Sequence, residues 1–88
     1  MKLKYTMRKI TVGGEITFVP VDAGARFSGV LNVNETGEFL LERLTQDTTV
    51  DALVAAVAAE YEGEPDAIRR EVTAFVEKLK QNELLTED

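Results

Sequence analysis

The sequence predicts an α+β domain in which three antiparallel strands precede three helices. Short runs rich in β-branched residues occupy the first third of the chain, and glycine-containing segments separate them. From residue 34 onward, apolar residues instead recur every three or four positions, as on one face of a helix. Because the strands come first and the helices follow without alternation, the order indicates an α+β arrangement.

The composition places the chain among small globular proteins. Its 88 residues are enough for a single domain spanning residues 1–88, with 44% hydrophobic and 30% charged residues. Cysteine and histidine are absent, which removes thiolate chemistry, the commonest general base and the commonest metal ligand. The basic start, MKLKYTMRK, lacks the apolar run of a signal peptide, and no stretch has the length of a membrane span. We therefore expect a cytoplasmic protein with no cofactor and no membrane partner.

The net charge of −6 bears on the kind of partner. Binding to a nucleic acid backbone without sequence preference needs clustered lysine and arginine, so the charge disfavours a nucleic acid partner. It fits a polypeptide partner, or an acidic surface that only keeps the domain soluble.

The first two strands are expected at about residues 5–12 and 16–21, with Gly13-Gly14 between them as a hairpin signal. Pro20 has no backbone N–H, so it should lie at a strand end or on an unpaired side. The third strand is expected at residues 30–33, after an irregular connection in which Phe27 is the expected core anchor.

The hairpin register depends on the length of the loop. A two-residue loop would place the apolar residues of the two strands on opposite faces. A three-residue loop that includes Glu15 would pair Val12 with Ile16 and Ile10 with Phe18. Because all four would then share a face that can be buried, we expect the three-residue loop.

The helices are expected at about residues 35–45, 50–61 and 65–82. Asn34 is the expected N-cap of the first helix, and Thr48 or Thr49 that of the second. Gly37 costs about 1 kcal/mol inside a helix, which indicates the close approach of another backbone.

The ends of the last two helices carry further signals. Gly63 is the expected C-cap of the second helix, and Pro65 opens the third. After the third helix, Leu84-Leu85 should fold back onto the core. A hairpin packed on three helices with a short helix-turn-helix link is a winged helix-turn-helix-like arrangement.

Residues that would support an enzyme are missing. Ser28 is the only serine and has no histidine to activate it, and Gly13-Gly14 joins two strands rather than opening a helix as a phosphate loop does. Glu35, Glu38 and Glu42 lie along one side of a helix, as on a solvated face. We expect a protein that is not an enzyme.

The segment at residues 34–40, Asn-Glu-Thr-Gly-Glu-Phe-Leu, closely resembles the LNETGAFLW-type segment of the PqqD family. The hairpin ending in Val19-Pro20, the Thr-capped second helix and the Glu71–Leu85 segment also match the family pattern, so the resemblance covers nearly the whole chain. The departures are mild: Val33 replaces a leucine, Leu41 the usual tryptophan, and Glu83 a common glycine.

This resemblance implies a recognition module for ribosomally synthesised, post-translationally modified peptides (RiPPs). Members of the family bind the leader of a precursor peptide and present it to a modifying enzyme, often a radical SAM protein. The leader adds as a strand to the edge of the third strand, against the third helix. An open sheet edge suits this mode of binding. The expected peptide-binding residues on that strand are Val30, Leu31, Asn32 and Val33.

One flank of the third helix should form the other wall of the groove. One candidate flank carries Arg69, Thr73, Val76 and Lys80, and the opposite one carries Glu71, Lys78 and Asn82. The residues leave the choice open. We expect the first flank, because Val76 could bury an incoming side chain and the two cations could pair with acidic leader residues.

The sequence is also compatible with two alternative functions. A winged-helix DNA-binding protein would need a basic third helix, but its four cations are offset by acids. A small interaction domain with a different partner, acting through dimerisation, is the second alternative. Since each apolar stripe is narrow enough to be used up in one core, we expect a monomer that associates with its enzyme.

Overall fold

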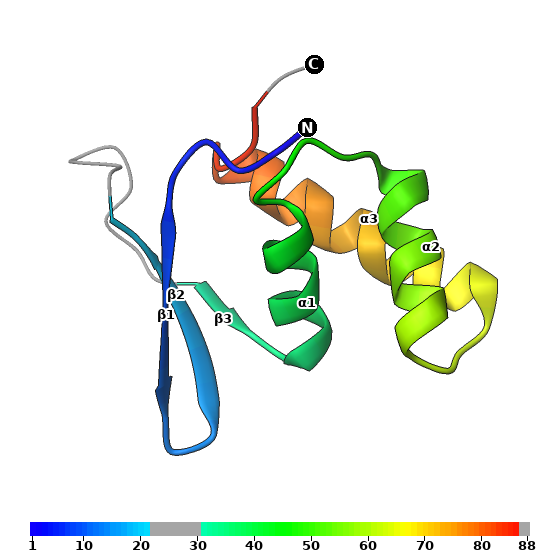
Figure 1. The fold of residues 1–88 in the computed structure, drawn as a ribbon, viewed down its shortest axis with the longest axis horizontal. Helices are drawn as coiled ribbons and strands as arrows, with labels where there is room; N and C mark the ends of the chain where they lie inside the picture. The colour runs from blue at the N-terminus through cyan, green and yellow to red at the C-terminus, as the bar shows by residue number, and fades with distance from the viewer. Residues whose placement is uncertain (22–30, 87–88) are drawn as a thin grey trace.

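The computed structural model describes residues 1–21 and 31–86. One antiparallel sheet contains β1 (Met7–Val12), β2 (Glu15–Pro20) and β3 (Leu31–Val33) in that spatial order. Helices α1 (Glu35–Arg43), α2 (Val50–Glu60) and α3 (Pro65–Gln81) follow (Figure 1). The expected α+β order is confirmed. The expectations for Phe27 and Val30 lie outside the described residues.

The β1–β2 hairpin has a two-residue loop, so the expected three-residue loop is wrong. Val12 pairs with Glu15, and Ile10 therefore faces Thr17 instead of Phe18. Gly13 and Gly14 have φ angles of 58° and 84°. Two successive positive φ angles are those of a type I′ turn, whose twist matches that of the flanking strands.

The hairpin tip explains why burial did not select the other register. The tip extends away from the helices (Figure 1), and Ile10 and Val12 are 43% and 70% exposed. Burial fixes a register only where one face of the sheet has a core to pack on. At the tip that condition is not met, and the conformation of the two glycines decides the pairing.

Side chains at the helix starts satisfy backbone N–H groups as expected. Asn34 Oδ1 accepts a hydrogen bond of 2.9 Å from the Gly37 N–H, and Thr49 Oγ1 accepts one of 3.1 Å from the Ala52 N–H. Pro65 occupies the first turn of α3. The end of α2 differs from the expectation, because Tyr61 turns the chain into an extended conformation before Gly63 is reached.

The end of α3 folds the tail back onto the core. Glu83 adopts a positive φ of 56°. The Leu84 N–H donates to the Leu79 carbonyl at 3.0 Å, and the Glu83 N–H donates to the Lys80 carbonyl at 2.9 Å. These two bonds form a Schellman motif, in which the residue with positive φ is usually glycine. Leu84 and Leu85 are buried as expected.

The core lies between the inner face of the sheet and the three helices. Its buried side chains come from every helix, from β2 and β3, and from both ends of the chain. The N-terminal segment is held across the C-terminal one, since Leu3 bridges Leu85 and the Lys4 N–H donates to the Leu84 carbonyl at 2.8 Å. Among the described residues, the helices are too short or too polar to cross a bilayer.

Candidate functional site

β3 is an edge strand, because the sheet order ends with it. In an antiparallel sheet a residue directs its N–H and C=O to the same side, and the next residue directs its own to the other side. The pair that closes a two-residue hairpin loop is hydrogen-bonded, and here it is Val12 with Glu15. This starting point shows which backbone groups of β3 face the open edge.

The alternation runs from the loop across the sheet. Thr17 directs its backbone groups to β1, as Glu15 does, so Phe18 directs its groups to β3. Leu31, the partner of Phe18, is therefore bonded to β2. Asn32 must then point its N–H and C=O away from the sheet, toward the open edge. A hydrogen bond of 2.9 Å from the Val21 N–H to the Thr6 carbonyl follows the same alternation on the other side of β2.

The side chains of β3 hold this edge in place. Leu31 is buried, and Val33 packs against the core from a half-buried position. The Thr17 hydroxyl donates to Asn32 Oδ1 at 2.8 Å on the outer face of the sheet. The Asn32 side chain is thus occupied, while its backbone groups remain directed outward.

Gly37 allows α1 and α3 to approach the end of β3 closely. A Cβ atom at Gly37 would lie 2.7 Å from the Val33 Cβ and 3.2 Å from Cε1 of Phe75. The neighbours are therefore side chains, and the expected close approach of another backbone is wrong. Glycine is required here because a side chain would collide with Val33.

A groove of about 250 Å³ opens between the start of α1 and one flank of α3. The α3 side chains that line it are Glu71, Ala74, Phe75 and Lys78. Its α1 side is formed by Asn34, Thr36, Gly37 and Leu40. Because Asn34 directly follows β3, the groove begins at the end of that strand. It combines a half-buried aromatic wall with one acidic and one basic side chain.

The residues of the flank expected to face the third strand do not line this groove. Arg69 forms an ion pair of 2.9 Å with Asp51 of α2, and Lys80 lies 3.9 Å from Glu77 of its own helix. Val76 is a core residue with 1% exposure, and Thr73 is exposed. The groove is lined instead by the flank that carries Glu71 and Lys78. The packing of Phe75 on Gly37 sets this rotation of α3.

Two signals in the sequence point to the flank that lines the groove. Gly37 interrupts a helix and so marks a contact, and Phe75 is the one aromatic residue of the third helix and stands at the edge of its apolar stripe. A helix puts residues 71, 75 and 78 on one side. The aromatic ring is large enough to meet the surface opposite the glycine.

A second cluster, on the far side of α1, combines aromatic rings with acidic side chains. The rings of Phe39 and Tyr61 meet edge to face at 5.6 Å, and the Arg43 guanidinium lies 4.6 Å from the Phe39 ring centre. Burial, followed by the negative charge of Glu35 and nearby glutamates, raises the pKa of Tyr61. The neutral phenol is therefore retained to higher pH.

The family model described as coenzyme PQQ synthesis protein D (PqqD) matches residues 19–85. The chain belongs to the PqqD family. The resemblance carried by the segment at residues 34–40 is thereby confirmed. No curated protein sequence matches the chain.

A solved structure shares the PqqD-type fold found here. It is described as TbiB1 in complex with the TbiA(beta) leader peptide, with a TM-score of 0.72 and 20% sequence identity over 100% of both chains. At this identity the likeness shows the fold, and membership of the family supports a peptide-recognition module of the RiPP type.

Proposed function

We propose that this PqqD-family protein binds the leader of a ribosomally synthesised precursor peptide by adding it as a strand to β3. The observation that carries the proposal is the open edge at Asn32, together with a groove on α3 that begins at the end of the same strand. A strand added to an open edge gains backbone hydrogen bonds, and its alternate side chains can enter a neighbouring groove. The leader peptide named for the solved structure of the same fold supports a leader peptide as the ligand.

The proposed peptide-binding residues come from two elements. On β3 they are Leu31, Asn32 and Val33, with Asn32 supplying the outward backbone groups. On α3 they are Glu71, Ala74, Phe75 and Lys78, which line the groove. Arg69, Thr73, Val76 and Lys80 do not line it, so we propose no direct contact for them.

The role of the protein is to present the peptide without catalysis, in our proposal. The chain has neither histidine nor cysteine. Within residues 1–21 and 31–86, no three acidic side chains gather closely enough to hold a metal ion. The partner enzyme is a radical SAM protein or another RiPP-modifying enzyme, and the domain acts in the cytoplasm as a monomer of residues 1–88.

DNA binding by the winged-helix arrangement has less support. Of the cations on α3, Arg69 is paired with Asp51 and Lys80 lies near Glu77. Phosphate binding would have to displace these carboxylates on a chain with a net charge of −6.

The test is a selection of binding peptides from a random library displayed on their own mRNA. The selected peptides are then titrated into ¹⁵N-labelled protein. We expect the largest shifts at the amides of Asn32, Phe75 and Lys78. Selected peptides that leave these three amides unchanged would exclude β3 and α3 as the binding site.

A further inference from the structure

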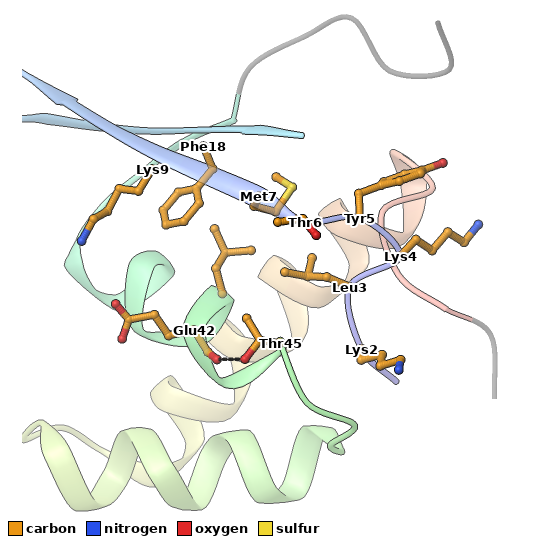
Figure 2. A pocket seen from close by; sticks show the side chains of 11 residues that line it. Lys2, Leu3, Lys4, Tyr5, Thr6, Met7, Lys9, Phe18, Glu42 and Thr45 are labelled. Carbon is orange, nitrogen blue, oxygen red and sulfur yellow. Dashed lines mark hydrogen bonds between the residues drawn. The ribbon is translucent and has the colours of Figure 1, made fainter. Parts of the chain in front are cut away.

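A second groove lies at the opposite edge of the sheet, between β1 and the C-terminal half of α1 (Figure 2). Its volume of about 500 Å³ exceeds that of the groove on α3. Its floor is apolar and includes Phe18 of β2 and Leu41 of α1. The floor can therefore accept one or more apolar side chains.

The rim of this second groove is basic. Figure 2 shows Lys9 at one end and Lys2 and Lys4 at the other. Glu42 is the single acidic residue among those that line it. Lys9 is already paired with Glu38 at 2.6 Å. A hydrogen bond from the N-terminal amine lowers the pKa of Asp47 and the charge of Lys2 helps to lower it, but no described carboxylate lies within ion-pair distance of Lys2 or Lys4.

The amino-acid sequence shows the same concentration of positive charge near its start. Four of its ten lysine and arginine residues lie within the first nine positions, and the first acidic residue is Glu15. In a protein with a net charge of −6, this segment is the exception. Such a local excess of positive charge attracts and orients an acidic partner.

The backbone at this edge is arranged like that of β3. β1 is the other outer strand of the sheet. Since Val12, Ile10 and Arg8 pair through hydrogen bonds with β2, the alternation directs the N–H and C=O of Met7 and Lys9 outward. Both residues also line the second groove. An added strand would thus have backbone partners at the edge and an apolar floor beneath it.

We propose that the β1 groove binds an extended acidic segment of a partner protein, as a second strand added to the sheet. The segment has apolar side chains at its centre, over Leu41, and carboxylates toward Lys2 and Lys4. The identification of the partner as the modifying enzyme rests on the proposed function, whereas the groove and its charge do not. Leader and enzyme would then be held on opposite edges of one sheet.

A second copy of this chain is a poorer occupant of the same edge. Antiparallel pairing of two β1 strands through Met7 and Lys9 would place Arg8 or Lys9 of one copy directly opposite the same cation of the other. Like charges across a strand pair are destabilising. Charge complementarity therefore favours an acidic segment from another protein.

The experiment uses two capped synthetic peptides with ¹⁵N-labelled protein. Both peptides have leucine and valine at the centre. One peptide carries glutamates at its ends, and the other carries glutamines there. We expect the glutamate peptide to shift the amides of Met7, Lys9 and Thr45 and to bind about fivefold more tightly at low salt, as a few screened ion pairs allow. Added salt should remove the difference.

Matched charge reversals complete the test. The double variant Lys2→Glu/Lys4→Glu should remove the advantage of the glutamate peptide. The double variant Arg69→Glu/Arg70→Glu changes the net charge equally but lies on α3, and it should keep the advantage. Equal loss in both variants, no shifts with either peptide, or concentration-dependent shifts without peptide would overturn the proposal.

The same samples separate this inference from the leader site. Peptides selected for the β3 groove should shift Asn32 and Lys78 in wild type and in the Lys2→Glu/Lys4→Glu variant. If the selected peptides shift Asn32 but the glutamate peptide does not shift Met7, only the second groove is rejected. If the glutamate peptide shifts Met7 but the selected peptides do not shift Asn32, only the proposed leader site is rejected.

Discussion

Val33 packs directly against the backbone of Gly37, so that a Cβ added to the glycine would stand 2.7 Å from the Val33 Cβ. Val33 belongs to β3 and Gly37 to α1, and this contact ties the strand edge to the helix. Because the opposing atom is the first of its side chain, it cannot move without moving the strand. The contact therefore fixes the position of Gly37, which lines the groove beside Phe75.

Gly37→Ala is expected to destabilise the protein. Alanine favours a helix by about 1 kcal/mol over glycine, but overpacking costs roughly 1–3 kcal/mol. We expect the free energy of unfolding, measured by urea denaturation, to fall by about 1 kcal/mol. Gly63→Ala is the control, because its Cβ would meet Ile68 at an ordinary 3.5 Å. An unchanged or higher stability of Gly37→Ala would show that β3 and α1 adjust freely.

Asn32→Pro tests the open edge of β3. Proline removes the outward N–H, which the sheet does not use, so we expect the variant to fold and to lose binding to selected peptides. Asn32→Ala keeps the N–H and loses only the hydrogen bond with Thr17, so it should still bind. Leu31→Pro should instead unfold the protein, because it removes a bond to β2 and a buried side chain. Calorimetry and circular dichroism distinguish these outcomes, and normal binding by Asn32→Pro would argue against strand addition.

Ala74→Glu tests the α3 wall of the groove. Ala74 is exposed and lines the groove, so a larger charged side chain should obstruct it and weaken peptide binding by about tenfold or more, equivalent to roughly 1.4 kcal/mol. Ala67 is also exposed on α3 but does not line the groove, and Ala67→Glu is the matched control. Both variants should unfold near the wild-type midpoint. Equal affinities for the two would remove α3 from the site.

Glu83→Gly should stabilise the end of α3. Glu83 has a φ of 56°, a conformation that costs a residue with a side chain roughly 1–2 kcal/mol and glycine little. Glycine also makes the unfolded chain more flexible, which offsets part of this effect. We therefore expect a net gain of about 0.5–1 kcal/mol in the free energy of unfolding. Gln81→Gly, within the helix, should destabilise by a similar amount. A loss of stability in Glu83→Gly would contradict the assigned cap.

Tyr61 should make stability fall at high pH. Burial and then Glu35 raise the pKa of its phenol in the folded state, so the folded protein binds this proton more tightly than the unfolded chain. The contribution is complete below the ordinary tyrosine pKa of about 10 and is lost as the pH rises through the folded value. Tyrosinate absorbance of a Tyr5→Phe variant reports Tyr61 alone. Glu35→Gln should lower its midpoint, and an unchanged midpoint would exclude that charge as a cause.

The sequence by itself determined the features that depend on near neighbours in the chain. The Asn34 and Thr49 caps and the first turn at Pro65 involve residues three or four positions apart. The apolar periodicity likewise predicts which side of each helix is buried. The segment at residues 34–40 was also distinctive enough to indicate the family.

Only the tertiary structure decided the hairpin register and the flank of α3 that lines the groove. Ile10 and Val12 are apolar, but the tip on which they lie has no core to bury them, so the turn of Gly13 and Gly14 prevails. The rotation of α3 depends on Phe75 meeting Gly37, two residues far apart in the chain. The spacing of apolar residues along a helix defines the centre of its apolar stripe. Which elements pack on either side of that stripe depends on long-range contacts, which local spacing does not encode.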